Sequence, residues 1–286
     1  MTRKFHITLF KPDHPRFRIM DSHQEVIDSL LWGFAACGLD CSFALNTIDR
    51  QRTNIVFGWI IGAQLGALAE LPDDSILYNF EQFSERQLAG SNLGLLAQRF
   101  QIWDYSAANL PRWLECNPRH PPFHAPVSYA PTLSRIDPAP VQDIDALFIG
   151  SIGPTRQAKL ADIAALVTRP SVVSLCNVWG ATRDGFIARS RLMLNVWEQQ
   201  AHLRIFEVAR VSYYLANRKA VVCDAVPGQH VDDDLRAALV FAPREQLADT
   251  CARLLDDPLE HARVAEQGYE AFRRRDVRDL IRQFFA

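Results

Sequence analysis

The stretch from Leu192 to Gly228 has the sequence LMLNVWEQQAHLRIFEVARVSYYLANRKAVVCDAVPG and decides the fold of the chain. Its first apolar run, Leu192 to Val196, is as short and as well bounded as a buried strand. Apolar residues then recur every three or four positions from Leu203 to Ala216, which predicts a helix with one apolar face. Asn217-Arg218-Lys219 ends that helix with basic residues, which suit its C-terminus, and Ala220 to Cys223 forms a second strand. Strand, loop, helix and strand make a βαβ unit, whose loop and helix start can receive an anion.

Glu207 lies near the start of this helix, with Arg204 and Arg210 one turn to either side of it. A carboxylate there can accept two hydrogen bonds from a ribose diol while the helix start faces a diphosphate. It can equally be an acidic residue of a first turn that is paired with its neighbouring arginines. The local sequence alone favours the pairing, so the rest of the chain has to support the ribose role.

Length and composition indicate two globular domains. The chain has 286 residues, of which 48% are hydrophobic, enough for two domains of about 100 to 150 residues each. The 31 basic and 33 acidic residues leave a formal net charge of -2, so no global field attracts nucleic acid. We expect no nucleic-acid partner.

The six cysteines are scattered without a Cys-x-x-Cys pair, and several lie in apolar runs. Free thiols in such positions behave as small hydrophobes, which predicts a reducing compartment and no zinc site. No apolar stretch approaches the length of a membrane span, and the N-terminus enters a strand directly instead of presenting a signal peptide. We therefore expect a cytoplasmic protein with at most peripheral membrane association.

His23 follows the first predicted strand. That strand, Phe5 to Phe10, leads into a loop with two prolines. Ser22 to Glu25 fits the capping box S-x-x-E and begins a helix that Gly38 closes. His23 would then lie in the first turn, where it could act as a general base, hold a sugar hydroxyl, or have no role beyond the helix.

Two carboxylates also follow predicted strands in the first half. Ser75 to Phe80 is a strand that delivers Glu81 at its C-terminal end, where open α/β sheets bind ligands. Trp103 to Ser106 has the pattern of a strand end that passes into a helix cap, and it carries Asp104. Either carboxylate could line an acceptor site, or be a cap or a satisfied interior group.

The segment from Pro118 to Pro140 contains seven prolines and shows little helical or strand period. It predicts the crossing between two domains, which we expect to span residues 1–135 and 136–286, with a final helix that could pack back on the first domain. His120 and His124 have the spacing of two metal ligands on a helix. Because the prolines forbid that helix, we predict no metal site there.

The second domain restarts with the strand Ile144 to Ile149 and a glycine-bearing turn at Gly150 and Ser151. Such a turn lets backbone N–H groups approach phosphate, which Arg156 or Lys159 can neutralise. The turn matches neither a Walker loop nor G-x-G-x-x-G, and an ordinary α/β turn with a surface arginine is the alternative.

Two further features of the second half have ordinary alternatives. Trp179 follows a strand and could stack on a nucleobase, although a loop tryptophan more often anchors to the core. The amphipathic segment from Leu280 to Phe285 predicts a packing helix in preference to a membrane anchor.

Three segments together resemble the C-terminal half of GT-B-fold glycosyltransferases, in the group-1-like and spore-maturation-protein-like branch. They are Ala146–Ser151, then Phe206–Arg210 with Ala220–Asp224, and finally Leu254–Pro258 with Ala265–Tyr269. The N-terminal segments Tyr78–Gln82 and Trp103–Ser106 are similar to that branch as well. The resemblance covers most of the chain.

The resemblance implies an α/β protein of two Rossmann-like domains that face each other across a cleft, the first for the acceptor and the second for a nucleotide-sugar donor. It implies transfer of a sugar to a hydroxyl of a glycan, lipid-linked or small-molecule acceptor, in cell-surface glycan synthesis, without a cofactor. Because the chain has no credible His/Cys cluster, we also expect donor binding without a metal. The donor would meet Gly150, Ser151, Arg156, Lys159, Trp179, Arg204 and Glu207, with Glu207 on the ribose and Arg156 and Lys159 on the diphosphate. The catalytic candidates are His23, Glu81 and Asp104.

One departure from the family keeps other functions open. The family's E-x7-E pattern would place its first glutamate at position 199, where the chain has Gln199 beside Glu198. A catalytically silent nucleotide-sugar-binding or scaffold protein is therefore one alternative. A nucleotide-sugar epimerase on the same fold is another.

Overall fold

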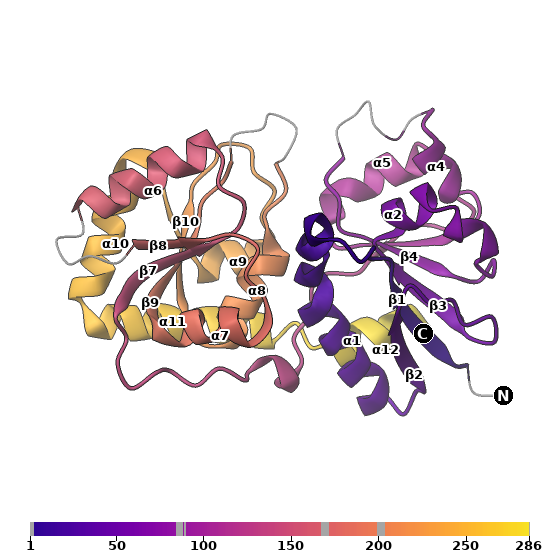
Figure 1. Cartoon of the computed structure of the whole chain (residues 1–286), viewed down its shortest axis with the longest axis horizontal. Coiled ribbons are helices and arrows are strands. Elements are labelled where there is room, and N and C mark those ends of the chain that lie inside the picture. The colour runs from indigo at the N-terminus through magenta and orange to yellow at the C-terminus, as the bar shows by residue number, and fades with distance from the viewer. Residues whose placement is uncertain (1–2, 84–87, 89, 167–171, 199–203, 286) are drawn as a thin grey trace. The chain divides into compact units, whose positions relative to one another are not determined.

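The computed structural model describes residues 3–83, 88, 90–166, 172–198 and 204–285. The chain divides into two compact α/β units, which Figure 1 shows. Unit 1 comprises residues 1–130 and 276–286, and unit 2 comprises residues 131–275. The chain thus leaves unit 1 after Ala130, ahead of the predicted boundary at 135, and returns to it at Asp276.

Unit 1 is built on a parallel sheet in the order β2-β1-β3-β4-β5-β6. The strands are β1 (Phe5–Leu9), β2 (Cys41–Leu45), β3 (Thr53–Phe57), β4 (Ile76–Asn79), β5 (Gln101–Asp104) and β6 (Phe123–His124). β1 and β3 are buried along their whole length, so they form the centre of the core. The strand order reverses between β1 and β3, and open α/β sheets bind ligands at that switch point.

The connection from β1 to the first helix differs from the prediction. Most of the predicted loop is a 3-10 helix, η1 (Pro15–His23), which runs directly into α1 (Gln24–Ala36). Ser22 is therefore no helix cap, and the predicted capping box is wrong. Residue 23 already has right-handed helical backbone angles, and the Gln24 N–H donates to the Asp21 carbonyl, so η1 supplies acceptors that a capping side chain would otherwise provide.

The last helix of the chain, α12 (Val277–Phe285), belongs to unit 1 and packs against α1. A β-carbon at Gly33 of α1 would come within 2.8 Å of both Val277 and Ile281, so only glycine allows this approach. The other helices of unit 1 are short: α2 (Trp59–Gln64), η2 (Ala67–Glu70), α4 (Asn92–Leu96), η3 (Ala107–Asn109) and α5 (Leu110–Leu114).

Unit 2 repeats the topology of unit 1 with one strand fewer. Its parallel sheet has the order β11-β10-β9-β7-β8, so the strand order reverses between β7 and β9. The strands are β7 (Ile144–Ile149), β8 (Val172–Leu175), β9 (Ser190–Asn195), β10 (Ala220–Asp224) and β11 (Val240–Ala242). The helices are α6 (Pro154–Leu166), α7 (Gly180–Arg189), α8 (Val208–Ala216), α9 (Asp233–Ala238), α10 (Leu247–Asp256) and α11 (Pro258–Arg273).

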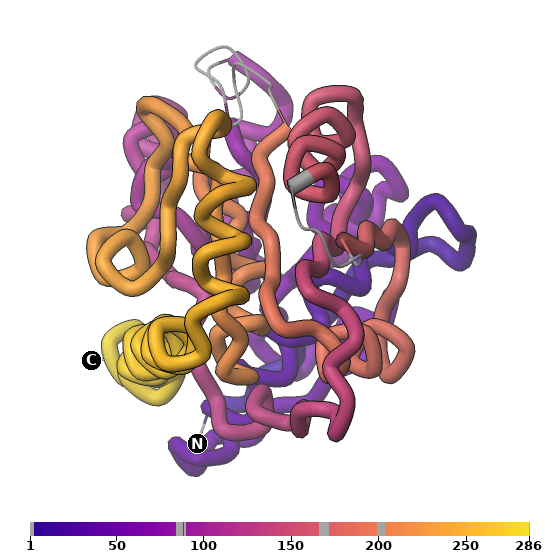
Figure 2. The backbone as a smooth tube through the Cα atoms, turned by 90° about the vertical axis from the view of Figure 1, so that its left-hand side faces the viewer, coloured from indigo at the N-terminus to yellow at the C-terminus, as the bar shows by residue number. Residues whose placement is uncertain are grey.

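The helices of unit 2 cover both faces of its sheet, with α6 above and α7 and α11 below in Figure 1. α6 and α10 pack side by side, as the view in Figure 2 shows. Their apolar residues bury the core-facing side chains of β7, β9 and β10, among them Phe148, Leu194 and Val222. None of the helices in the described part of the chain is long and apolar enough to cross a membrane.

The helix α8 begins later than its apolar spacing predicts. Leu203 lies outside the described residues, and α8 starts at Val208 with Glu207 as its N-cap. Ile205 pairs with His230 as an isolated bridge, and the Phe206 N–H donates to the His230 carbonyl at 3.0 Å. This pairing holds the chain extended before residue 207, and that is why the helix cannot begin earlier.

The crossing into unit 2 is anchored on the end of α8. The Asn217 side-chain oxygen accepts the backbone N–H groups of Arg135 and Ile136 at 2.9 and 2.8 Å. The Ser134 hydroxyl donates to the Ala216 carbonyl at 2.7 Å. The proline-rich segment is therefore fixed to unit 2 within a few residues of leaving unit 1.

Candidate functional site

The switch point of unit 2 gathers a cluster of charged side chains. Arg156 comes from α6, which follows β7, while Glu207 and Arg210 come from the start of α8, which follows β9. Because β7 and β9 are neighbours in the sheet, the loops that follow them meet at its C-terminal edge. We call Arg156, Glu207 and Arg210 the charged cluster.

Glu207 bridges the two arginines of the charged cluster. Its Oε1 accepts from Arg156 Nη2 at 2.5 Å and from Arg210 Nη2 at 3.2 Å, and its Oε2 accepts from Arg210 Nη1 at 3.3 Å. The Glu207 side chain keeps 22% of its surface exposed. An ionised carboxylate has about four acceptor positions, so these three bonds leave about one for a ligand. Glu207 can therefore bind both hydroxyls of a ribose only after an arginine releases it.

Arg156 is buried, and every hydrogen-bonding nitrogen of its side chain has a partner. Nε donates to the Val196 carbonyl at 2.7 Å, and Nη1 donates to the Ser151 carbonyl and hydroxyl at 3.0 and 3.1 Å. Burial lowers the pKa of Arg156 below its ordinary value, and the charge of Glu207 opposes that shift. Ser151, which was predicted to approach phosphate, here orients the arginine.

Arg210 is the more accessible arginine of the cluster. Its Nη1 also donates to the Asn195 side-chain oxygen at 3.1 Å, and its guanidinium lies 5.2 Å from the centre of the Phe148 ring. A β-carbon at Gly150 would lie 3.0 Å from Arg210 Nη2. The glycine thus makes room for a guanidinium, a reason that the sequence pattern did not reveal.

The N-terminus of α6 already holds a carboxylate. The Glu198 oxygens accept the backbone N–H groups of Thr155 at 3.2 Å and Arg156 at 3.3 Å. A β-carbon at Gly153 would lie 2.5 Å from one of these oxygens, so the glycine is what admits them. In this structure a side chain of the protein therefore occupies the place where a helix N-terminus binds an anion.

Lys159, the second predicted phosphate ligand, is buried. Its ammonium forms an ion pair with Asp224 and donates to the Trp197 carbonyl at 3.1 Å. The charge of Lys159 is thus compensated inside the unit, and the ammonium does not face solvent.

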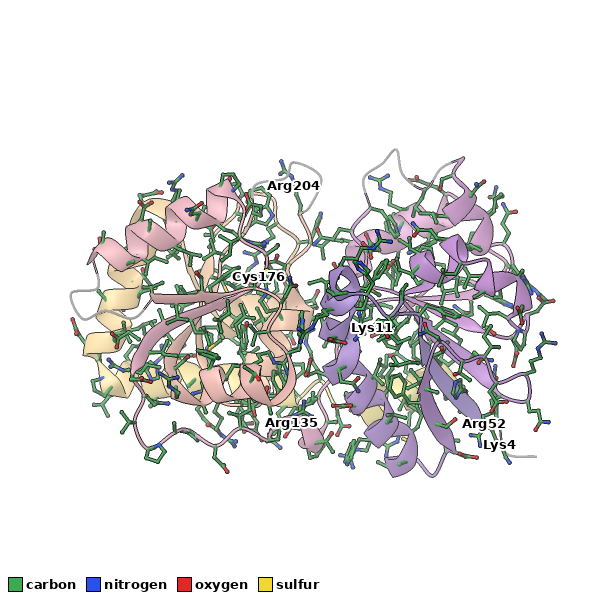
Figure 3. All side chains as sticks on the ribbon, viewed as in Figure 1. Lys4, Lys11, Arg52, Arg135, Cys176 and Arg204 are labelled. Atoms are coloured by element: carbon green, nitrogen blue, oxygen red, sulfur yellow. The ribbon has the colours of Figure 1, made fainter. Side chains whose placement is uncertain are left out.

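Trp179 and Arg204 have other surroundings than those predicted for them. Trp179 is the N-cap of α7; its indole N–H is buried and has no hydrogen-bond partner among the described residues. Arg204 is exposed, as Figure 3 shows, and donates to the Pro227 carbonyl at 3.3 Å. Glu207 therefore pairs with Arg156 and Arg210, and the predicted pairing with Arg204 is wrong.

His23 lies at the switch point of unit 1, at the end of η1. Its ring contacts Phe57 and Phe80, with centroids 5.8 and 5.2 Å away. The Nδ1–H donates to the Met20 carbonyl at 3.0 Å, because a carbonyl can only accept. Burial lowers the pKa of His23, which favours the neutral ring. This tautomer leaves Nε2 as a proton acceptor, and Nε2 has no partner in the described part of the chain.

Glu81 is exposed just after β4, and its backbone is held by two amides. Asn79 and Asn109 each donate to the Glu81 carbonyl at 2.9 Å, and the Asn79 oxygen accepts the Glu81 N–H at 3.1 Å. The position of the turn is thus fixed. Glu81 is exposed as a residue, while burial raises the pKa of its carboxyl group.

Asp104, by contrast, has no exposed surface. Oδ1 accepts from the Ser106 backbone N–H and the Asn109 amide at 2.9 and 3.1 Å. Oδ2 accepts from the Asn79 amide and the Trp113 indole, both at 2.7 Å. Burial raises the pKa of Asp104 to about 7, although the four hydrogen bonds favour the ionised form. Asp104 cannot touch a ligand in this structure and holds the Glu81 turn through the two asparagines.

No group of three or more His, Cys, Asp or Glu side chains in the described ranges could hold a metal ion. The chain has two Asp-x-Asp spacings, and both are taken up by ion pairs. Asp143 and Asp145 pair with Arg189 and Arg191. Asp232 and Asp234 both pair with Arg275.

The sequence analysis missed two site residues as ligand candidates. Arg210 was noted only as a neighbour of Glu207, and Glu198 only as the residue beside position 199, which lies outside the described residues. The three-residue spacing predicts the pair of Arg210 with Glu207 but gives no sign that Arg210 joins Arg156 in one cluster. Nothing in the local sequence indicates that Glu198 reaches α6, because that contact joins segments 42 and 43 residues apart.

Neither a family model nor a curated protein matches the sequence. Solved structures do match the fold. The chain is similar to HepE of Anabaena in complex with UDP and glucose, with 13% identity, 98% of each chain covered and a TM-score of 0.61. It is similar to an alpha-glucosyltransferase in complex with UDP and a 13-mer DNA, with 8% identity, 99% of each chain covered and a TM-score of 0.63.

A third similar structure is AviGT4, a glycosyltransferase involved in avilamycin A biosynthesis, with 13% identity, coverage of 98% of this chain and 96% of that one, and a TM-score of 0.55. These matches run over nearly the whole chain and both units. The protein has the two-domain GT-B fold of glycosyltransferases. The predicted fold class is confirmed.

Proposed function

We propose that this protein is a glycosyltransferase that moves a sugar from a nucleotide-sugar donor to a hydroxyl acceptor. The observation that carries the proposal is the charged cluster at the switch point of unit 2 in a GT-B fold. Similar structures hold UDP or UDP-glucose, so UDP sugars are the first donors to test. The six cysteines are all free thiols, which suits the cytoplasm, a reducing compartment.

The charged cluster supports donor binding by exchange of partners. A diphosphate presents oxygens that match a guanidinium as well as a carboxylate does. When a diphosphate binds Arg156 and Arg210, the Glu207 carboxylate loses hydrogen bonds from these arginines. Its freed acceptor positions can then bind the ribose hydroxyls. The two guanidinium groups then stabilise the negative charge that develops on the departing nucleotide diphosphate.

His23 is our candidate for the general base on the acceptor. Its Nδ1–H bond to the Met20 carbonyl orients the ring, and the lowered pKa keeps Nε2 ready to take a proton. The acceptor hydroxyl would give its proton to Nε2 while its oxygen forms the new bond to the sugar. Glu81 is a second candidate because it stands on a fixed turn and burial raises the pKa of its carboxyl group, which makes it a better base.

One observation favours a silent binding protein as the second candidate. Arg156 and Lys159 are both buried and both paired with carboxylates in this structure. If phosphate oxygens never replace the carboxylates bound to Arg156 and Lys159, these side chains cannot hold a diphosphate in position for transfer. Binding of a nucleotide sugar without turnover, across a broad acceptor panel, would support this candidate. A nucleotide-sugar epimerase would instead convert the sugar without needing any acceptor.

The test combines a thermal-shift screen with a product assay. Nucleoside diphosphates and their sugars are added to the purified protein, and a ligand at 100 times its Kd should stabilise the fold by about 2.7 kcal/mol. The best donor is then incubated with acceptors while free UDP, or the corresponding diphosphate, and the sugar product are measured. We expect stabilisation by at least one nucleotide sugar and acceptor-dependent release of the diphosphate. The absence of any nucleotide binding in calorimetry would overturn the proposal.

A further inference from the structure

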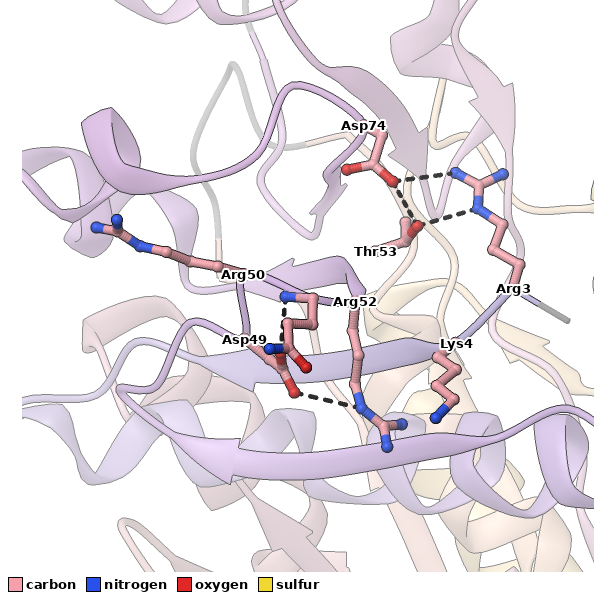
Figure 4. Close-up of a pocket in the computed structure, with 8 residues that line it drawn as sticks. Arg3, Lys4, Asp49, Arg50, Arg52, Thr53 and Asp74 are labelled. Atoms are coloured by element: carbon pink, nitrogen blue, oxygen red, sulfur yellow. Dashed lines mark hydrogen bonds and ion pairs between the residues drawn. The ribbon is translucent and has the colours of Figure 1, made fainter. Parts of the chain in front are cut away.

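Most of the arginines that the structure describes in unit 1 are paired with carboxylates. A hollow of about 880 Å³ at the N-terminal edge of the sheet illustrates this (Figure 4). Arg52 pairs there with Asp40 and Asp49, and Arg3 lies 3.7 Å from Asp74. Arg50, at the rim, pairs with Glu70. The arginine charges of this hollow are thus compensated within the protein, although Lys4, which also lines it, has no ion-pair partner among the described residues.

The segment η1 at the opposite edge of the sheet breaks this pattern. Arg16 and Arg18 are exposed, and neither has an ion-pair partner among the residues that the structure describes. The one acid within η1, Asp21, is bound to Lys11. Asp13, just before the segment, pairs with neither arginine. Two positive charges that are two residues apart therefore remain uncompensated.

Both arginines stand on a fixed backbone. The His14 ring accepts the Arg16 backbone N–H at 3.2 Å and caps the segment. The Asn46 side chain exchanges two hydrogen bonds with the backbone of Lys11, at 2.7 and 2.8 Å. The Arg16 guanidinium lies 4.5 Å from the centre of the Phe17 ring, which restricts its orientation. The backbone of the segment and the Arg16 side chain are therefore oriented before a ligand binds, which lowers the entropic cost of binding.

The position of η1 connects it to the chemistry of unit 1. It follows β1, one of the two strands at the switch point, and it ends at His23. Ile19 lies between the arginines and His23 and is 50% exposed. An acceptor that brings a hydroxyl to His23 would thus meet positive charge and a small apolar surface on the same segment.

We propose that Arg16 and Arg18 bind a phosphate group carried by the acceptor, so that the substrate class is a phosphorylated glycoside or sugar. The inference rests on the proposed transferase function. A phosphate ester offers oxygens in the fork geometry of a guanidinium, and two guanidinium groups match the double charge of a phosphomonoester. An uncharged acceptor would leave the two arginines without a partner.

The experiment compares matched acceptor probes on the UDP-saturated protein. Glucose, galactose, mannose and N-acetylglucosamine are each titrated beside their 6-phosphates by calorimetry. We expect the phosphorylated member of at least one pair to bind about 10-fold or more tightly. The double variant Arg16→Ala/Arg18→Ala should bind both members of that pair equally. Raising the salt concentration should weaken only the phosphate-dependent part.

Arg119→Ala is the matched control, because Arg119 is also an exposed arginine of unit 1 without an ion-pair partner in the described ranges. It precedes β6, at the N-terminal edge of the sheet, and its loss should leave the phosphate preference intact. No preference for any phosphorylated probe in the unchanged protein would overturn the proposal, as would a preference that survives in the double variant.

Two further arms identify the source of the phosphate and separate the two proposals. Vesicles of phosphatidylcholine with and without phosphatidylglycerol test a lipid phosphate, and arginine-dependent binding to the anionic vesicles would assign the phosphate to a lipid-linked acceptor. UDP itself is titrated into all three proteins and should bind equally. Failure of UDP to bind the unchanged protein would count against the transferase function, whereas equal UDP binding without phosphate preference would count against the acceptor class alone.

Discussion

Asp104 is the last residue of β5 in unit 1, and Glu207 caps α8, the helix that follows β9 in unit 2. Both carboxylates lie at the C-terminal edge of a parallel sheet, yet their surroundings are opposite. Asp104 has no exposed surface and accepts four hydrogen bonds from uncharged N–H donors. Glu207 is partly exposed and is bound by two guanidinium groups. The same place in the topology thus holds a carboxylate fixed for structure and a carboxylate poised for exchange.

The partners of the two carboxylates distinguish a structural role from a ligand-binding role. Uncharged donors that are buried with a carboxylate lose their only partner if it moves, so the arrangement around Asp104 has one stable state. Guanidinium groups at a partly exposed site can accept a ligand anion in place of the carboxylate. Partner charge and exposure, rather than position after a strand, therefore decide which carboxylate can serve a ligand. Five predictions test the roles that we assign to the two units.

The largest effect is expected for His23, which lies in the same unit as Asp104 but is our candidate for the general base. His23→Ala should lower kcat by about 100-fold or more, because a general base typically contributes at least that factor. The affinity for the donor should hardly change, since His23 belongs to unit 1. Steady-state kinetics with the donor and acceptor varied separately give this split. An unchanged kcat would leave His23 with a structural role only.

The next effect is on stability. Asp104→Ala should lower the free energy of unfolding by about 3 kcal/mol or more, because several buried donors lose their acceptor at once, at about 1 to 3 kcal/mol each. Chemical denaturation measures it. Asp143→Ala, which removes an exposed ion pair with Arg189, is the control and should cost at most about 1 kcal/mol. Equal losses in the two variants would contradict the structural role of Asp104.

Glu207→Ala should act on the ligand instead. If Glu207 binds the ribose hydroxyls, its removal should weaken UDP binding by about 10- to 150-fold, the worth of charge-assisted hydrogen bonds. Calorimetric titration with UDP, beside a melting curve, checks this. Glu266→Ala is the control, because Glu266 makes an exposed pair with Arg218. Unchanged UDP affinity with a lowered melting temperature would reject the ribose role.

Lys219 offers a smaller test of a buried charge that has no carboxylate partner in the described part of the chain. It donates to the Ser190 carbonyl at 2.8 Å, and burial lowers its pKa from 10.5 to about 8. Between these two values the unfolded chain binds more protons than the folded one, so the free energy of unfolding should rise with pH across that window.

Lys219→Met should abolish this rise, and at pH 7 it should change the free energy of unfolding by about 1 kcal/mol or less, because the Ser190 carbonyl keeps a donor in Gln142. Urea denaturation of both proteins from pH 7 to pH 10 measures the two slopes. Parallel curves for the variant and the unchanged protein would show that Lys219 does not titrate in this range.

The smallest effect is expected from metal removal. The arginines of the charged cluster supply positive charge at the proposed diphosphate position, a task that a divalent ion performs in other sites. UDP affinity should therefore be the same in EDTA and in magnesium. Loss of UDP binding in EDTA that manganese or magnesium restores would contradict this prediction.

Most strands of both sheets were predictable from the sequence, because short β-rich apolar runs such as Ile144–Ile149 are distinctive. The two edge strands β6 and β11 were not, because they are only two and three residues long. The start of α1 was not, since the S-x-x-E pattern at Ser22 cannot show that a 3-10 helix precedes it. The partner of Glu207 was mispredicted for a similar reason. Helical spacing pointed to Arg204 and Arg210, and only the pair with Arg210 is present. Arg156 instead reaches Glu207 across 51 residues through the pairing of β7 with β9.

The return of α12 to unit 1 also has a consequence for how the protein is made. The ribosome synthesises the whole of unit 2 before residues 276–285, so the first unit to emerge is the last to be completed. Until then Gly33 of α1 and the rings of Phe5 and Phe34 lack the covering side chains Val277, Ile281 and Phe285. Domains usually mature from the N-terminus during translation. Here unit 2 can finish folding while unit 1 waits with an open apolar face.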